Sequence, residues 1–168
     1  QLRIMAYNRV VTGLSGHDPA SFLSAVAERW EVGAPGADPT PAGPRQVSMY
    51  LGGVWRALTP KPGVVDLADP VRRLDVAVLQ DHLLAPVLGI ADPRRDERIA
   101  FVGGIRGTAE LAARVDRMPL GVAFSMHPTA MAELLAVADA GEVMPPKSTW
   151  FEPKLSSGLL VHALGDLP

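Results

Sequence analysis

Cysteine is absent from the 168-residue sequence. Its absence excludes disulfide bonds, catalysis by a thiolate and cysteine-rich zinc sites, and it leaves the redox compartment undetermined. Long apolar runs are also missing, because none approaches the roughly 20 residues that a membrane-spanning helix needs. No basic start followed by an apolar core marks a signal peptide. These absences predict a soluble, cytoplasmic chain that does not enter a membrane.

An excess of positive charge is missing as well. The formal net charge is −2, and the arginines are scattered along the chain. A protein that binds the phosphate backbone of nucleic acid needs a basic stripe, so nucleic acid is not an expected partner. The histidines lie far apart, without His-x-His or His-Glu-x-x-His spacing, at positions 17, 82, 127 and 162. No metal site is therefore predicted.

The length and the apolar content set the expected size of the fold. Apolar residues make up 48% of the 168 residues, which is enough for one domain with a core of its own and too little for two. We therefore expect residues 1–168 to form a single domain. The sequence begins at Gln1 and alternates apolar residues almost at once. This start predicts the C-terminal domain, or another fragment, of a longer protein.

The first elements are indicated by the spacing of apolar residues. Residues 3–10 alternate with a period of two and end in β-branched residues, which is typical of a strand. Asp18 and Pro19 are the residue types of an N-cap and a first helical position. The helix that follows should pack one face on a sheet, because apolar residues recur at helical spacing, namely Phe22, Leu23, Val26, Ala27 and Trp30.

A β-hairpin is predicted at residues 47–58. Two alternating runs, 47–51 and 54–58, flank Gly52-Gly53, and two glycines meet the demand of a two-residue hairpin turn for positive φ angles. Loops rich in proline and glycine are expected before and after it, at residues 33–44 and 59–69.

A strongly apolar helix is predicted from about residue 76 to residue 88, with Asp75 as its N-cap. Its apolar residues cover an arc that is too broad for a single core face. Two interpretations fit this pattern. Either the helix lies deep inside its own domain, or it packs against a second partner, which would be a missing part of the protein or the other subunit of a homodimer.

The last third of the chain alternates strands and helices. A strand at 98–102 leads through a glycine-rich turn to a helix capped by Thr108, and a strand at 120–124 leads to a helix that Gly141 ends. A short strand at 159–161 follows. Strand, helix, strand, helix at this spacing predicts right-handed parallel crossovers. Together with the hairpin, these two tandem strand-helix crossover units predict an α/β or α+β fold with a mixed sheet.

The turns after those two strands form the candidate site. Parallel crossovers would bring both turns to one sheet edge, which is where open sheets bind ligands. Glycines there allow close backbone approach, and the amides at two helix N-termini favour an anion such as phosphate or carboxylate. The alternative is that these glycines and threonines only end strands and begin helices. The predicted ligand-binding residues are Gly103, Gly104, Arg106, Thr108, His127, Thr129, Lys147, Ser148 and Thr149.

Lysine draws attention to the proline-rich segment 141–158. The sequence has lysine at positions 61, 147 and 154 against thirteen arginines, so this segment holds most of the lysines. A lysine supplies a compact, mobile cation that suits an anionic group. If the segment returns to the sheet edge, Lys147 joins the two helix N-termini around one anion. Otherwise it is an ordinary proline-stiffened surface loop.

Five segments resemble, in the same order, a bacterial and archaeal family catalogued as domain of unknown function 1015. They are residues 7–11 (Tyr-Asn-Arg-Val-Val), 74–79, 101–104, 127–129 (His-Pro-Thr) and the proline-rich stretch 143–159. The resemblance implies that this chain is the C-terminal part of such a protein. Full-length members have an upstream half with an Asp-Gly-His-His-Arg motif, reminiscent of the ParB and sulfiredoxin superfamily. That superfamily binds nucleotides and in some cases phosphorylates free serine.

The expected function is binding of an anionic or phosphate-bearing small ligand, such as a nucleotide. The resemblance implies that the missing N-terminal ParB-like half completes the site, with small-molecule phosphotransfer as a conceivable activity of the whole. The alternative is a structural or dimerisation module built around residues 76–88. An enzyme complete within this sequence is not indicated, because no set of nucleophile, base and orienting residue is recognisable. The sequence identifies no cofactor and no catalytic residue.

Overall fold

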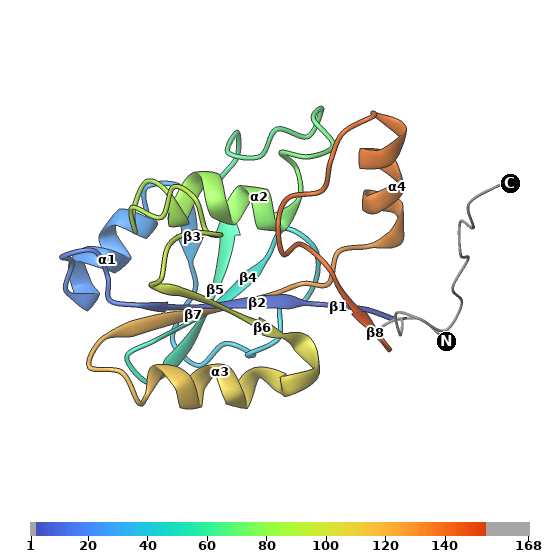
Figure 1. Ribbon diagram of the computed structural model, residues 1–168. Helices are drawn as coiled ribbons and strands as arrows, with labels where there is room; N and C mark the ends of the chain where they lie inside the picture. Colours follow the sequence, from blue (N-terminus) through green and yellow to red (C-terminus); the bar gives the residue numbers. More distant parts are fainter. Residues whose placement is uncertain (1–2, 154–168) are drawn as a thin grey trace, which may run out of the picture.

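The computed structural model describes residues 3–153, and its centre is a six-stranded sheet in the order β3-β5-β4-β7-β2-β6. Figure 1 shows this sheet between two helical layers, with α1 and α2 on one side and α3 on the other. A second, two-stranded sheet pairs β1 with β8. The predicted α/β class is confirmed. The predicted strand at 159–161 lies outside the described residues.

The bounds of the elements are as follows. The strands are β1 (Arg3–Met5), β2 (Tyr7–Thr12), β3 (Trp30–Val32), β4 (Val47–Leu51), β5 (Val54–Pro60), β6 (Ile99–Gly103), β7 (Gly121–Met126) and β8 (Trp150–Glu152). The helices are α1 (Pro19–Val26), α2 (Asp75–Leu79), the π-helical η1 (Gln80–Leu84), the 3₁₀ turn η2 (Gly104–Arg106), α3 (Gly107–Val115) and α4 (Met131–Asp139).

The predicted hairpin is present as β4 and β5. Leu51 pairs with Val54 across the turn, and Gly52 and Gly53 have φ angles of 59° and 82°. Positive φ at both central residues is what a two-residue turn between right-twisted strands requires. This local signal was sufficient because the turn residues and the alternation on both sides agree.

The two strand-helix units are present, but every pairing in the large sheet is antiparallel. β6 and β7 run in the same direction, as crossover strands should, yet they do not pair with each other. β2 lies between them and pairs with both. The expected parallel pairing, and with it the mixed sheet, was therefore wrong in detail. A strand from the start of the chain enters the gap, and local spacing cannot reveal such an insertion.

Two further strands, β3 and β8, were not predicted, because each is only three residues long. The predicted opening strand divides into β1 and β2, and β1 pairs with β8 to form a ribbon beyond the sheet. Asp18 caps α1, accepting hydrogen bonds from the N–H groups of Ala20 and Ser21 at 2.8 Å each. The helix ends at Val26, however, and Trp30 begins β3 at the far sheet edge.

The apolar helix predicted at 76–88 is covered by its own chain. Its first part is α2 and its second part is η1, and its leucines at 79, 83, 84 and 88 are each no more than 1% exposed. Of the two interpretations, the structure therefore supports the buried helix, because these leucines are covered by other described residues of the same chain. Asp75 does not cap this helix, but accepts a hydrogen bond from the N–H of Arg45 at 2.9 Å.

Core side chains cover both faces of the sheet. Val11 belongs to the large cluster beneath α1 and α2, whereas Val10 belongs to a smaller cluster beneath α3. Consecutive residues of a strand point to opposite faces, so β2 contributes to both cores. Within the described residues, no helix is long and apolar enough to cross a bilayer.

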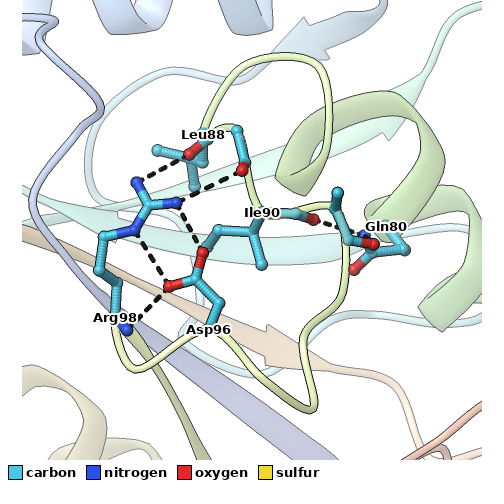
Figure 2. Close-up of polar contacts among 7 residues, drawn as sticks. Gln80, Leu88, Ile90, Asp96 and Arg98 are labelled. Atoms are coloured by element: carbon cyan, nitrogen blue, oxygen red, sulfur yellow. Dashed lines mark hydrogen bonds and ion pairs between the residues drawn. The ribbon is translucent and has the colours of Figure 1, made fainter.

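The loop between η1 and β6 is fastened by side chains (Figure 2). Gln80 donates to the carbonyl of Ile90 at 2.7 Å. Arg98 donates to the carbonyl of Leu88 at 3.0 Å and forms an ion pair with Asp96 at 2.7 Å. These contacts tie the loop to the π-helical segment on one side and to the start of β6 on the other.

Candidate functional site

The turns after β6 and β7 border one cavity. Tyr7 pairs with Gly103, and Arg9 pairs with Phe124, so the ends of both strands lie at the same level on either side of β2. A cavity of about 450 Å³ occupies this edge, and we call it the edge cavity. Its lining includes Gly104, Gly107 and Thr108 from the first turn, Ser125, Met126 and Pro128 from the second, and Arg3 and Asn8.

The N-terminus of α3 opens into the edge cavity without a side-chain cap. The sequence predicted that Thr108 would cap this helix, but no side chain caps it. The short turn η2 precedes the helix, and the first helical residues themselves line the cavity. The N–H groups of a first helical turn have no partner inside the helix and carry a partial positive charge. The N–H of Gly107 already donates to the carbonyl of Gly104, and the N–H groups that follow it are available to an anion.

Two buried polar side chains also line the edge cavity. Asn8 and Ser125 are 2% and 3% exposed. The side-chain carbonyl of Asn8 accepts a hydrogen bond from the N–H of Met126 at 3.0 Å. Among the described residues, neither the amide nitrogen of Asn8 nor the hydroxyl of Ser125 has a hydrogen-bond partner. No buried side-chain nitrogen or oxygen among the described residues lacks a partner, so these two donors reach the surface of the cavity and are open to a ligand.

The charge of the lining favours a negatively charged ligand. Arg3 supplies a cation, and among residues 3–153 no acidic residue lines the edge cavity. The helix terminus, the Asn8 amide and the hydroxyls of Ser125 and Thr108 can all donate hydrogen bonds to a ligand. A site with many donors and no carboxylate suits phosphate or carboxylate oxygens, which are acceptors.

Gly103 and Gly104, two of the predicted ligand-binding residues, allow close packing within the protein rather than close approach of a ligand. A Cβ atom on Gly103 would lie 2.8 Å from the Trp150 ring, and one on Gly104 would lie 2.9 Å from the carbonyl oxygen of Ala6. Their close approach therefore lets the β1–β8 ribbon pack onto the end of β6. Gly104 still lines the edge cavity, whereas Gly103 lies beneath Trp150. Arg106 is exposed beside them.

The proline-rich segment does return to the sheet, but on the other face. Lys147 Nζ lies 5.6 Å from the centre of the Tyr7 ring, and Tyr7 points to the face opposite Asn8. Thr129 donates to the carbonyl of Ser148 at 3.0 Å, which fastens the segment to the turn after β7. Lys147, Ser148, Thr149 and Thr129 are thus brought together, away from the lining of the edge cavity.

His127 lies at a separate cavity of about 400 Å³, lined also by Arg45, Arg73 and Glu133. Burial raises the pKa of the neighbouring Asp75 to about 6. The hydrogen bond from Arg45 opposes this rise, Glu133 adds to it and His127 opposes it. Within residues 3–153, no group of three His, Asp or Glu side chains could hold a metal ion.

Asn8, Ser125 and Arg3 line the edge cavity but were not predicted from the sequence. Ser125 is the polar residue of a fully buried strand, β7, and Asn8 stands in β2 with the buried Val10 and Val11. A polar residue inside an apolar strand was the available signal, since such residues are seldom fully buried without a reason. Nothing in the local pattern indicated that these strands lie side by side.

Residues 1–77 match the model of a family described as protein of unknown function (DUF1015). The chain resembles the DUF1015 family. This match confirms the resemblance inferred from the sequence, and it lies in the first half of the chain, before the segment at 143–159. Among proteins of curated function, none matches this sequence significantly.

Solved structures of a free serine kinase share the fold. A mutant kinase in complex with AMP aligns at a TM-score of 0.50 and 16% identity, over 89% of this chain and 54% of the kinase chain. A mutant in complex with ADP gives 0.49 and 17%, and the kinase without a stated mutation, with AMP, gives 0.48 and 14%, over the same shares of each chain. The chain thus spans about half the length of this kinase. At such identity the likeness concerns the fold alone.

Proposed function

We propose that this chain binds the phosphate group of a small molecule in the edge cavity. The observation that carries the proposal is the convergence of unused donors there: the uncapped α3 N-terminus, the Asn8 amide and the Ser125 hydroxyl. A phosphate offers several acceptor oxygens and negative charge, so it would accept hydrogen bonds from donors that face the cavity without a partner among the described residues. Arg3 adds charge at the same cavity.

Binding, rather than catalysis, is what we propose for this chain. The part of the chain that the structure describes gives the edge cavity no carboxylate and no imidazole, which are the usual general bases for transfer of a phosphoryl group. If the whole protein is a small-molecule phosphotransferase, its base comes from an upstream ParB-like half that completes the site. The alternative of a dimerisation module loses its main support, because α2 and η1 are buried within the chain.

The first test is titration calorimetry with AMP and with adenosine. AMP is a suitable probe because a kinase that shares the fold was solved with it. We expect AMP to bind and adenosine to bind on the order of tenfold more weakly or worse, because charge-assisted hydrogen bonds to the phosphate are lost. Equal affinity for both ligands, or binding of neither, would remove the proposal.

Two buried serines provide a matched pair of variants. Ser125→Ala removes an unused hydroxyl from the edge cavity, so AMP affinity should fall roughly tenfold while thermal stability is kept. Ser48, its cross-strand partner on β4, already donates to the carbonyl of Asp38 at 2.9 Å. Ser48→Ala should therefore lower stability and leave AMP affinity unchanged. An unaltered affinity in Ser125→Ala would contradict the assignment of the cavity.

Lys147→Met tests whether Lys147 contacts the ligand, as the sequence predicted, or lies outside the site, as the structure indicates. Lys147 lies against Tyr7, away from the edge cavity, so we expect AMP affinity to remain unchanged in the variant. A loss of binding would instead show that the segment around Lys147 contacts the ligand.

A further inference from the structure

Arg9 is buried, and no carboxylate among the described residues pairs with it. It is 3% exposed, and none of the ion pairs within residues 3–153 includes it. Burial lowers its pKa to about 10, so the guanidinium is still charged at neutral pH. A buried cation without a counter-ion is costly, and arginines this deep in proteins are usually paired.

The guanidinium of Arg9 is held in place by backbone groups. It donates to the carbonyls of Tyr7 and Lys147, the latter at 3.1 Å, and its central carbon lies 5.5 Å from the centre of the Phe101 ring. A guanidinium has five N–H donors in a rigid fork. Among the described residues no further acceptor is hydrogen-bonded to it, so donors with a fixed direction remain.

Arg9 lines a cavity of about 280 Å³ between the sheet, α2 and η1, which we call the Arg9 cavity. Its walls are mainly apolar and include Val76, Ala77, Leu84, Phe101, Pro145 and Pro146. The polar groups of the wall are otherwise engaged or exposed. The Gln80 amide donates to Ile90, as Figure 2 shows, and Arg72 and Asp81 are exposed residues.

Two irregular stretches of backbone border the Arg9 cavity. η1 is π-helical and supplies Gln80, Asp81 and Leu84 to the wall. Lys147, whose carbonyl holds Arg9, has a φ of 56°, in the left-handed region that residues with a side chain seldom adopt. Both features cost free energy, and both are found preferentially at functional sites.

We propose that the Arg9 cavity binds a small organic monocarboxylate with an apolar body. Its carboxylate pairs with the Arg9 guanidinium, whose fork matches two oxygens, and its body packs against α2 and the prolines. A phosphate dianion would find few further donors in these walls, and Asp81 would repel a second negative charge. The volume suits a short branched or aromatic acid.

This site is separate from the edge cavity. Asn8 lines the edge cavity and Arg9 lines the other. Because consecutive strand residues point to opposite faces, the two cavities lie on opposite sides of β2. The proposal therefore does not depend on phosphate binding.

The test compares an acid with its uncharged isostere. Amide NMR spectra of the isotopically labelled chain are recorded during titration with phenylacetate and with phenylacetamide. We expect phenylacetate to shift the amides of Ala77, Leu84 and Phe101, and to bind on the order of tenfold or more tightly than the amide. Equal affinities, shifts confined to other parts of the chain, or no binding of either compound would overturn the proposal.

Two variants test whether Arg9 is the residue that binds the carboxylate. Arg9→Met keeps the side-chain stem and should reduce phenylacetate affinity to that of phenylacetamide. Arg117→Met removes the same charge from an exposed position after α3, on the opposite side of the sheet, and should leave the affinity unchanged. If Arg9→Met binds phenylacetate as the wild-type chain does, the proposal is wrong.

A cavity-filling variant tests the same site without altering Arg9. Ala77→Leu places three extra carbon atoms in the cavity and should abolish phenylacetate shifts while circular dichroism reports a retained fold. If Arg9→Met fails to fold, this variant still shows whether phenylacetate binds in the Arg9 cavity. Undiminished phenylacetate binding by a folded Ala77→Leu chain would likewise overturn the proposal.

Discussion

Asp75 shows how one residue changes role between sequence and structure. As the first polar residue before an apolar run it resembled an N-cap, but it accepts a hydrogen bond from Arg45 across the loop. Burial raises its pKa to about 6 from an ordinary 3.8. The folded protein thus favours the protonated carboxyl group, so ionisation of Asp75 opposes folding.

This shift predicts a pH-dependent effect of Asp75→Asn. A folded pKa above the unfolded value contributes stability that is present below about pH 4 and is lost as the pH rises through 6. Asparagine lacks this titration. The free energy of unfolding of the variant, relative to wild type, should therefore increase by on the order of 2 kcal/mol between pH 4 and pH 7. Urea denaturation across that range measures it.

The control for this prediction is Asp139→Asn, which removes an exposed carboxyl group on α4. A difference between Asp75→Asn and wild type that is the same at every pH would contradict the assignment of the buried titration to Asp75.

The β1–β8 ribbon is the element that closes the end of the sheet. Trp150 of β8 packs edge-on against Tyr7 at a centroid distance of 5.2 Å and covers the backbone of Gly103. In Figure 1 the ribbon lies beyond the ends of β2 and β6. It separates the Lys147 segment on one face from the edge cavity on the other.

Gly103→Ala tests the docking of this ribbon. The new Cβ atom would lie 2.8 Å from the Trp150 ring, and a rigid aromatic ring cannot yield without moving the whole strand. We expect the variant to lose about 1–3 kcal/mol of unfolding free energy, measured by urea denaturation.

Gly43→Ala is the matched control, because a Cβ atom there meets nothing within 4 Å and its φ is not positive. Its stability should change by less than about 1 kcal/mol, toward stabilisation. If Gly103→Ala behaved as Gly43→Ala does, the ribbon would not be packed on β6.

At the scale of the whole molecule, the sheet is buried from both sides. The larger cluster joins the sheet to α1, α2 and η1, and the smaller joins it to α3. Val10 and Val11 are 1% and 0% exposed, although they face opposite layers. This architecture places a cavity on each face of β2.

Val10→Ala and Val11→Ala measure the two layers separately. Each variant removes two methyl groups from a fully buried site, so each should lose about 2 kcal/mol of unfolding free energy. Equal denaturant slopes would show that the layers unfold together. A near-neutral Val10→Ala variant would contradict a packed α3 layer.

The sequence alone determined the features that depend on neighbouring residues. The β4–β5 hairpin follows from two glycines that accept positive φ angles, the α1 start follows from Asp18 and Pro19, and the α4 end follows from Gly141, with a φ of 70°. β6 and β7 run in the same direction, so the turns after them reach one sheet edge, but the two strands are not adjacent as the sequence predicted, because β2 lies between them. Tertiary structure decided the rest. The insertion of β2 between β6 and β7 brought Asn8 beside Ser125 and set Arg9 against α2, while it placed Lys147 on the opposite face. Contacts between residues more than one hundred positions apart depend on which strands pair, and strand pairing is chosen by the burial of the whole sheet, which no local pattern encodes.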